Sequence, residues 1–377
     1  MTIMTTHIFI VNEQSFKVHL EYLFVGTGAK DKDIDFNGTT LSELHHQSEN
    51  GLVSMMADFS RIRKDDFVIF YVQAAKNNEG KFYGIYQIDS EPFHEPKGTY
   101  LKAELGKQLT FRALIKPFKV FAEGISEWEA LDEIKGIHSP NQMLWSLIYR
   151  KLKGNRGNTM ITIYEAKRLF HLLESKNNYT EIQGHHFTYN NGKQESNDAS
   201  SVIYTGDSTH KFDILQRLIH KKQTGKAYES HLQMYLVQNI GKNESLDKVL
   251  KIKSNTLDWI GNEVSCGVGM QRIDIMFSQN KDTISKEIVP IELKAVPASE
   301  DNIRQISRYI DWIEQYYVPN MPSVIRPILI CPQSQLSPQT INAFRNFNAK
   351  ANGRYLPLEY IEFVNKGTTL EFRNIVY

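Results

Sequence analysis

The sequence is poor in cysteine and has no long apolar runs. Its 377 residues include two cysteines, Cys266 and Cys331, which are far apart in the chain. Such a pair predicts reduced thiols in a cytoplasmic protein and makes a zinc site unexpected. The longest apolar runs, such as 67–72 and 325–331, have the length of strands and fall far short of the roughly 20 residues of a membrane-spanning helix. The sequence therefore predicts no membrane span.

The chain also lacks a charge excess, because its formal net charge at pH 7 is +1. This balance argues against a protein that coats nucleic acid nonspecifically, but it allows a local basic groove that faces phosphates. Two basic clusters are candidates for such a groove. They contain Arg150, Lys153, Arg156, Lys221 and Lys222. Each cluster could equally be a solvated helix end.

Length predicts two or three domains. Residues 1–174 contain several runs that are rich in β-branched and aromatic residues, and they predict a compact, mostly β domain with two or three helices. Residues 175–210 are polar and poor in aliphatic side chains, which predicts a linker or a mobile loop. In residues 211–377 strand patterns alternate with helical ones, so this part predicts an α/β domain with a mixed sheet.

The most informative stretch of the chain runs from Arg272 to Lys294. Apolar residues alternate with Asp274 in its first half, as in a half-buried strand. In the second half Glu292 and Lys294 are two residues apart, so on a strand they project from one face. A polar connection of about six residues between the two runs predicts a hairpin. The hairpin would bring two carboxylates and one ammonium group together.

Two carboxylates that converge repel each other, and a divalent cation would offset that repulsion. Mg²⁺ binds to a few carboxylate oxygens and keeps several waters, so Asp274 and Glu292 with a backbone carbonyl could hold it. We expect Mn²⁺ to substitute. Lys294 could orient or help deprotonate a metal-bound water and offset charge on a phosphoryl group. The alternative is a solvated strand face with a surface ion pair worth less than about 1 kcal/mol.

The order of Asp274 and Glu292-Leu-Lys294 resembles the PD-(D/E)xK nuclease signature. Upstream, Glu229 begins a helical pattern with an apolar stripe, and downstream Gln305 and Tyr309 resemble the Gln-x-x-x-Tyr helix of that family. The whole set most resembles the NucS-type endonuclease domain. The resemblance implies a mixed sheet flanked by helices and a metal site formed by Asp274, Glu292 and Glu229.

The resemblance further implies that Lys294 and Gln305 are catalytic and that Arg308 and Tyr309 lie near DNA. One departure from the pattern is Pro290, two residues before the acid Glu292. Proline lacks a ladder donor, so the strand pairing there is expected to be bulged or one-sided.

The N-terminal part weakly resembles PUA-like domains of the EVE and YTH branch. The resemblance rests on the run Asp-Asp-Phe-Val-Ile-Phe-Tyr at 65–71, followed by Phe-Tyr-Gly-Ile-Tyr at 82–86. It implies a nucleic-acid reader with an aromatic pocket for an extruded and modified base. The candidate walls of that pocket are Tyr71, Tyr86, Trp128 and Trp145. For each of these aromatics, packing in the core is the alternative role.

Together these features predict a cytoplasmic, Mg²⁺-dependent DNA endonuclease of a type II-like restriction or defence kind. Its substrate would be double-stranded DNA, and cutting both strands in one encounter favours a homodimer. A NucS-like repair endonuclease that acts on mismatched or branched DNA is one alternative. A nuclease fold that binds nucleic acid without cutting it is another.

Overall fold

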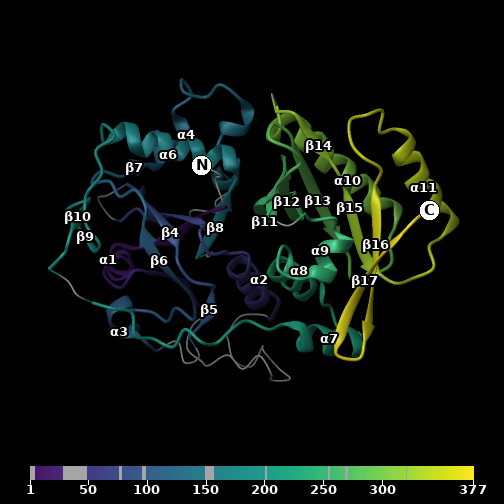
Figure 1. The fold of residues 1–377 in the computed structure, drawn as a ribbon, viewed down its shortest axis with the longest axis horizontal. Coiled ribbons are helices and arrows are strands. Elements are labelled where there is room, and N and C mark those ends of the chain that lie inside the picture. The colour runs from purple at the N-terminus through teal and green to yellow at the C-terminus, as the bar shows by residue number, and fades with distance from the viewer. Residues whose placement is uncertain are drawn as a thin grey trace. The chain divides into compact units, whose positions relative to one another are not determined.

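The computed structural model describes residues 5–28, 49–75, 79–95, 99–148, 157–199, 202–253, 255–267, 271–319 and 321–377. The chain forms two compact units, which Figure 1 draws as ribbons. Unit 1 consists of Met1–His138 and Gln142–Phe212, and unit 2 consists of Ser139–Asn141 and Asp213–Tyr377. In the described ranges no helix has the length and apolar character needed to cross a membrane.

Unit 1 is built on a mixed sheet with the strand order β2-β6-β4-β3-β1-β8, in which β5 pairs with β6 and β7 with β4. Its strands are β1 (Thr6–Val11), β2 (Phe24–Thr27), β3 (Phe67–Val72), β4 (Lys81–Ile88), β5 (Phe93–His94), β6 (Phe111–Pro117), β7 (Ile125–Ser126) and β8 (Asn158–Ile161). Strands β1 and β3 are parallel, whereas β3 and β4 form an antiparallel hairpin. Aromatic and β-branched side chains fill both faces of β3, which is buried along its whole length.

Among the described residues, side-chain caps mark the start of three helices of unit 1. The helices of this unit are α1 (Glu13–Tyr22), α2 (Glu49–Ser60), α3 (Lys102–Leu105), α4 (Glu127–Asp132), α5 (Trp145–Ile148) and α6 (Ile163–Lys176). At the start of α6 the Glu165 N–H donates to Thr162 Oγ1 at 3.2 Å, and the Thr162 N–H donates to Glu165 Oε2 at 2.6 Å. This capping box satisfies two backbone N–H groups at the start of α6.

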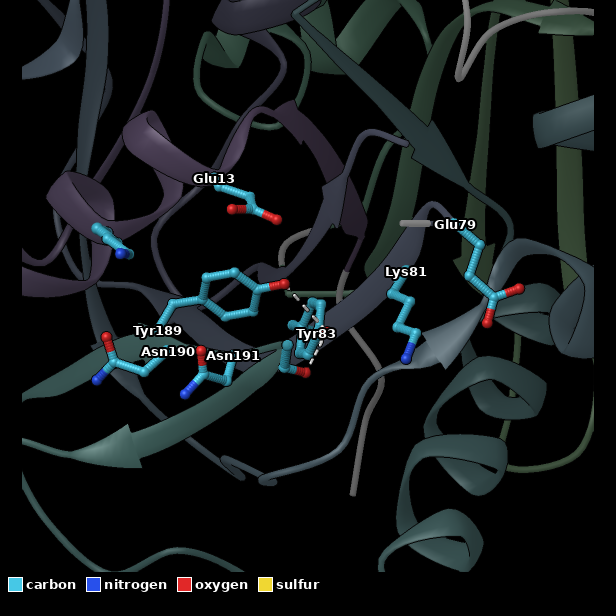
Figure 2. A pocket seen from close by; sticks show the side chains of 9 residues that line it. Glu13, Glu79, Lys81, Tyr83, Tyr189, Asn190 and Asn191 are labelled. Atoms are coloured by element: carbon cyan, nitrogen blue, oxygen red, sulfur yellow. Dashed lines mark hydrogen bonds between the residues drawn. The ribbon is translucent and has the colours of Figure 1, made fainter. Parts of the chain in front are cut away.

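The stretch 175–210, predicted as a linker, is part of unit 1. It contains an antiparallel hairpin of β9 (Phe187–Asn190) and β10 (Lys193–Ser196). Phe187 and Tyr189 alternate with polar residues and are both buried. Two aromatics at a spacing of two were enough to dock an otherwise polar segment, because a strand needs only one apolar face. The turn of this hairpin borders a polar pocket of unit 1 (Figure 2).

Unit 2 contains the mixed sheet that the sequence predicts, with the strand order β11-β12-β13-β15-β16-β17 and β14 paired to β13. Its strands are β11 (Leu257–Ser265), β12 (Arg272–Asn280), β13 (Lys286–Leu293), β14 (Ser323–Ile325), β15 (Ile328–Pro332), β16 (Glu359–Lys366) and β17 (Thr369–Ile375). The central strands β13, β15 and β16 are parallel, and the pairs at both edges are antiparallel. The predicted hairpin of Arg272 to Lys294 is therefore present as β12 and β13.

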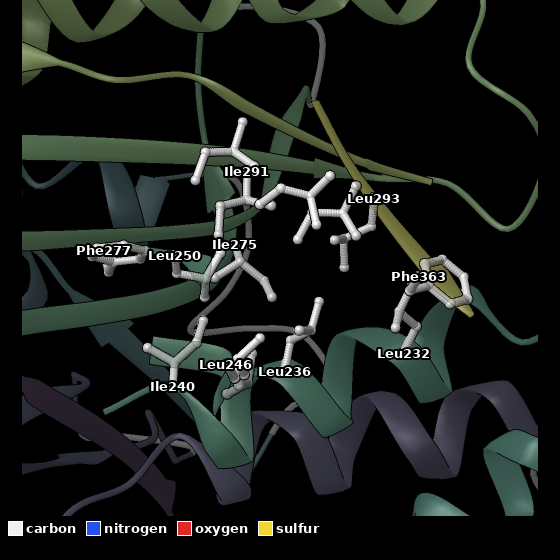
Figure 3. Close-up of a cluster of buried hydrophobic side chains, with 14 of the residues drawn as sticks. Leu232, Leu236, Ile240, Leu246, Leu250, Ile275, Phe277, Ile291, Leu293 and Phe363 are labelled. Carbon is white, nitrogen blue, oxygen red and sulfur yellow. The ribbon is translucent and has the colours of Figure 1, made fainter. Parts of the chain in front are cut away.

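The helices of unit 2 lie next to this sheet. They are α7 (Leu215–Gln223), α8 (Glu229–Asn239), α9 (Glu244–Val249), α10 (Glu300–Trp312), the π-helical turn η3 (Ile313–Tyr317) and α11 (Pro338–Ala349). Figure 3 shows Leu236 of α8 facing Ile275 of the hairpin and Leu232 of α8 beside Phe363 of β16, all of them fully buried. Packing of α8 on β12 and β13 fixes the hairpin against the helix that carries Glu229.

Pro290 lies where β13 changes neighbours. Against β12 the register runs through Pro290, opposite Met276, without a shift. On the other side β14 pairs with Lys286–Ile288 and β15 with Ile291–Leu293, so Pro290 has no ladder partner there. The expected one-sided pairing is present and the bulge is not, because the missing N–H of Pro290 falls between two neighbouring strands.

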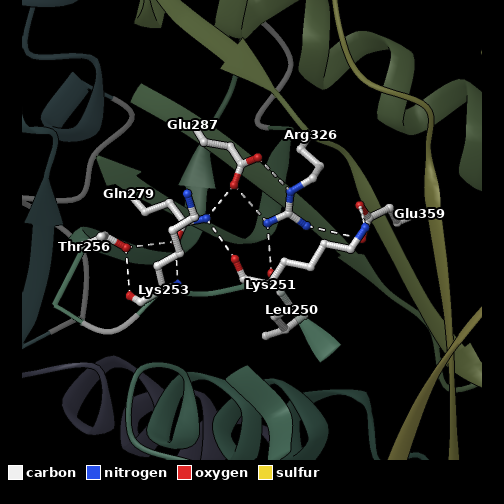
Figure 4. A network of polar contacts seen from close by, with 8 residues as sticks. All are labelled: Leu250, Lys251, Lys253, Thr256, Gln279, Glu287, Arg326 and Glu359. Atoms are coloured by element: carbon white, nitrogen blue, oxygen red, sulfur yellow. Dashed lines mark hydrogen bonds and ion pairs between the residues drawn. The ribbon is translucent and has the colours of Figure 1, made fainter. Parts of the chain in front are cut away.

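A buried guanidinium ties β13 to β16. Arg326 Nε lies 3.0 Å from Glu287 Oε1, and Arg326 Nη1 lies 3.3 Å from Glu359 Oε2. Arg326 Nη2 also donates to the Leu250 carbonyl at 2.9 Å (Figure 4). Although burial raises the pKa of Glu287, the hydrogen bonds and charge of Arg326 lower it overall. This network braces β13, the strand that carries Glu292.

Candidate active site

Asp274 and Glu292 lie side by side on neighbouring strands. The antiparallel register pairs Ile275 with Ile291, so Asp274 and Glu292 are the next opposed positions and share a face of the sheet. Asp274 Oδ2 accepts the Leu293 backbone N–H at 2.7 Å. Glu292 is fully buried, and Asp274 is half-buried. The structure thus brings together the two carboxylates that the sequence singles out.

Each of the two carboxyl groups is difficult to ionise in this position. Burial and the neighbouring Glu292 charge raise the pKa of Asp274 well above its usual range, against the opposing effect of the Leu293 N–H. Burial also raises the pKa of Glu292, although Lys294 and Tyr309 act in the opposite direction. A pair of raised carboxyl pKa values in one place is typical of a functional site rather than of a solvated strand face.

Lys294 forms an ion pair with Glu292, through Nζ and Oε1. Its backbone N–H donates to the Ile330 carbonyl of β15 at 3.0 Å, which holds this residue at the end of β13. Burial lowers the pKa of Lys294, but the neighbouring carboxylates, Glu292 foremost, together raise it above its usual value. Lys294 therefore stays an ammonium group at neutral pH, and its positive charge is what it offers to the site.

The helix α10 contributes Tyr309 and Gln305. The Tyr309 hydroxyl lies 2.7 Å from Glu292 Oε2 and 2.8 Å from the Arg272 carbonyl, and it donates its single proton to one of these acceptors. Gln305 Nε2 donates to the same hydroxyl at 2.5 Å. These residues are one helical turn apart, so they present one face to the strand. Tyr309 is the positioning residue of Glu292, and Gln305 reaches the carboxylate only through Tyr309.

Glu229, the first residue of α8, lies at the edge of the site. Its Oε2 accepts the Ala295 backbone N–H at 3.2 Å, while the Tyr228 hydroxyl donates to the Ala295 carbonyl at 3.1 Å. These bonds hold the segment that follows Lys294. The Glu229 charge is the smallest of the effects that raise the pKa of Asp274.

The acidic pair suits a hard divalent cation. Mg²⁺ is usually held by one or two carboxylates together with waters and substrate phosphates, and Asp274 and Glu292 supply two. Within the described part of the chain no three His, Cys, Asp or Glu residues form a metal-binding group. Asp274 and Glu292 would hold the cation, and Glu229 as a further ligand stays a prediction.

Three residues that the sequence analysis missed brace this site. Gln233 of α8 donates through Nε2 to the Asp274 carbonyl at 2.9 Å and to Glu263 Oε1 at 3.1 Å. Arg272 Nη1 donates to Glu263 Oε2 at 2.8 Å. Glu263 has a left-handed backbone with φ of 52°, a conformation that costs a non-glycine residue about 1–2 kcal/mol. Only Gln233 carried a signal in the sequence, namely its position one helical turn after Glu229.

Both cysteines lie near the acidic pair as free, buried thiols. Burial raises the pKa of Cys266 to about 12, with a smaller contribution from Glu292. Burial also raises the pKa of Cys331. Both residues stay protonated and serve as small apolar groups.

The predicted DNA-binding residues are placed unequally. Arg308 is exposed on α10, where its Nε donates to Gln271 Oε1 at 3.2 Å. Lys221 is buried, and Lys222 Nζ lies 4.4 Å from the centre of the Phe363 ring. Burial lowers the pKa of Lys222. The burial of Lys221 and the ring contact of Lys222 are not features that helix periodicity reveals. Arg150, Lys153 and Arg156 lie outside the described residues.

The four aromatics predicted to line a base pocket do not meet at one place. Tyr71 is in the core, and its hydroxyl donates to Glu127 Oε2 at 2.7 Å. Tyr86 packs on Phe70, on the opposite face of β3 from Tyr71, and its hydroxyl donates to Gln194 Oε1 at 2.8 Å. Trp128 on α4 is 58% exposed. The fourth, Trp145, begins α5. Strand alternation separates Tyr71 from Tyr86, so no single pocket can use both.

No protein-family model and no curated protein matches the sequence. Two solved structures are similar to part of the chain. One, described as a hypothetical protein from Leishmania major, is 10% identical with a TM-score of 0.31 and covers 46% of this chain and 96% of its own. The other, human THYN1 protein in complex with 5-methylcytosine containing DNA, is 10% identical with a TM-score of 0.26 and covers 45% of this chain and 98% of its own. Likenesses this distant carry no argument about activity, so the nuclease and PUA-like resemblances stay predictions.

Proposed function

We propose that the chain is a Mg²⁺-dependent DNA endonuclease of a restriction or defence kind, whose active site is the acidic pair of unit 2. A single observation carries the proposal. Two adjacent carboxylates with raised pKa values, Asp274 and Glu292, are held beside the ammonium group of Lys294. Like charges in a buried position cost stability, and a bound cation together with a phosphate substrate would repay that cost.

Each residue of the site has a separate task. Asp274 and Glu292 bind the cation, and Tyr309 fixes the Glu292 carboxylate through its hydroxyl. The cation, when bound, supplies Lewis-acid stabilisation of the phosphoryl oxygens and lowers the pKa of a coordinated water. Lys294 stays protonated, so it stabilises negative charge on the phosphoryl group rather than removing a proton.

Unit 1 is proposed to select the DNA, and the enzyme is proposed to work as a homodimer on double-stranded DNA. Phosphate contacts at the cleavage site carry no direct sequence information, so selectivity needs a second surface. Two copies of a single active site are the simplest way to cut two strands in one encounter.

The test is digestion of supercoiled plasmid and phage DNA with Mg²⁺ or Mn²⁺, followed by mapping of the cut ends. We expect nicked and linear products that disappear with a chelator and in the variant Glu292→Gln. The control Glu300→Gln changes an exposed acid at the start of α10 and should cut like the parent. Plain, methylated and mismatched duplexes compared in parallel would separate a restriction enzyme from a repair enzyme. Absence of cleavage with both metals, or normal cleavage by Glu292→Gln, would refute the proposal.

A further inference from the structure

Unit 1 contains a polar pocket of about 760 Å³ that none of the proposed catalytic residues lines. Three separate segments form it, namely the first turns of α1, the start of β4 and the turn between β9 and β10. The lining residues are Glu13, Lys17, Glu79, Lys81, Tyr83, Tyr189, Asn190, Asn191 and Gly192. In Figure 2, Glu13 lies across from the ring of Tyr189, and Asn190 and Asn191 lie beside it. Its volume is in the range of sites that take small organic ligands.

Two buried tyrosines form an aromatic floor. The rings of Tyr83 and Tyr189 meet edge to face with centres 5.4 Å apart. The Tyr83 hydroxyl donates to the Gly192 carbonyl at 2.7 Å and accepts from the Tyr189 hydroxyl at 3.5 Å. Burial raises the pKa of both phenols. The floor is therefore uncharged and rigid, as a platform for a planar group requires.

The charged walls balance each other. Glu13 and Glu79 supply two carboxylates, and Lys17 and Lys81 supply two ammonium groups. Neither lysine has an ion-pair partner among the residues that the structure describes. The two lysines would repel a simple cation in the pocket, and the two carboxylates would repel a simple anion. The pocket therefore suits a ligand that has an anionic end and a polar, uncharged body.

An asparagine in the turn adds a hydrogen-bonding edge. Asn191 has a left-handed backbone with φ of 47°, which asparagine tolerates better than most residues. Its side-chain amide has no hydrogen-bond partner within the described ranges. An amide presents a donor and an acceptor in one plane, the pattern that pairs with the edge of a nucleobase.

We infer that this pocket binds a nucleotide, with the base against Tyr189 and Asn191 and the phosphate at Lys17 and Lys81. A nucleotide combines an anionic end, a planar aromatic body and a polar edge, and each of these matches one wall of the pocket. The nucleotide could be free or part of a polynucleotide. That the nucleotide belongs to a DNA strand rests on the proposed function, in which unit 1 selects the DNA.

The experiment is calorimetric titration of the full chain in a chelator, which removes divalent cations and so prevents cleavage. The ligands are the four deoxynucleoside monophosphates, the matching nucleosides, inorganic phosphate, glycine and short single-stranded oligonucleotides. We expect binding of at least one nucleotide. The double variant K17Q/K81Q should weaken nucleotide binding about tenfold and leave nucleoside binding unchanged, because it removes only the charge-assisted bonds.

A second variant separates the base from the phosphate. Asn191→Gly keeps the left-handed turn and removes the side-chain amide. It should therefore weaken the binding of nucleotides and nucleosides alike by about fivefold. The control Asn352→Gly changes an exposed asparagine of unit 2 with φ of 44° and should have no effect. Tighter binding of oligonucleotides than of mononucleotides assigns the pocket to a strand, and equal binding assigns it to a free nucleotide.

Three results would overturn the inference: no nucleotide or oligonucleotide binds, glycine or phosphate alone binds as well, or both variants bind like the parent. Since the titration does not measure cleavage, its failure leaves the nuclease proposal standing. Conversely, an inactive acidic pair would leave nucleotide binding unaffected.

Discussion

At the scale of single residues, the acidic pair shows that a functional site can hold a charged group in a position where it destabilises the fold. Asp274 loses hydration and faces Glu292, and one backbone N–H from Leu293 is its compensating hydrogen bond. In the absence of a cation, such a site holds a proton more tightly than the unfolded chain does. The residues proposed to bind the metal should therefore lower the free energy of unfolding as long as no metal is bound.

Asp274→Asn should stabilise the metal-free protein at neutral pH. The pKa of Asp274 is raised in the folded state, so between about pH 4 and that raised pKa the native state binds more protons than the unfolded state. Stability then falls as pH rises through this window. The variant removes the charge, and we expect a Tm a few degrees above the parent at pH 7–8 and equal to it near pH 4. With Mg²⁺ only the parent should gain in Tm.

Asp282→Asn is the matched control for this measurement. Hydrogen bonds from Ser285 lower the pKa of the exposed Asp282 to about 2, so the sign is reversed. The ionised Asp282 carboxylate stabilises the fold above pH 4, and this stabilisation is lost as the pH falls. The variant should therefore be less stable than the parent at pH 7. Thermal unfolding in a chelator at four pH values checks both variants. A loss of stability in Asp274→Asn at pH 7 would contradict the raised pKa.

Tyr309→Phe should weaken metal binding by about 10- to 100-fold without unfolding unit 2. The change removes the hydroxyl that holds Glu292 Oε2 and keeps the ring that packs in the core. Loss of such a supporting hydrogen bond usually affects affinity on this scale. Tyr355→Phe is the control, because its hydroxyl donates to the Phe347 carbonyl at 3.0 Å in another part of unit 2. Mg²⁺ titration would count against a positioning role if both variants bound the metal equally.

At the scale of helices and strands, the sequence predicted best where one short pattern decides the structure. Strands β12 and β13 follow from period-two alternation. Helix α1 was missed, although Asn12 and Ser15 form a capping box there, because serine stands in place of the usual glutamate or glutamine. The hairpin β9-β10 was missed because its surroundings are polar.

The site residues show the same division. Asp274, Glu292 and Lys294 are close in sequence, so strand geometry alone brings them together. The contact between Gln233 and Glu263 depends on how α8 packs against β11, and no local pattern encodes that packing. Likewise, the burial of Lys221 depends on tertiary neighbours. Local sequence patterns identify site residues within one hairpin or helix, but they do not identify contacts between elements that depend on tertiary packing.

At the scale of the whole molecule, the division into two units makes the proposed tasks separable. Each unit has its own sheet and its own core, as an independently folding domain needs. A fragment of residues 213–377 keeps the acidic pair, and we expect it to cut DNA with Mg²⁺ and little discrimination. A fragment of residues 1–212 keeps the nucleotide pocket and should prefer the duplexes that the full chain cuts.

The comparison that decides this division is made on one set of labelled duplexes, with cleavage by the full chain as the reference. Phosphate contacts supply affinity that falls with salt, whereas base contacts supply preference, so both fragments are measured at two salt concentrations. The control for residues 1–212 is the Asn191→Gly variant of that fragment, which should bind all duplexes more equally. If residues 213–377 alone retain the full selectivity while residues 1–212 show no preference, unit 2 reads the DNA itself. Unit 1 would then have to act in dimerisation or as a scaffold.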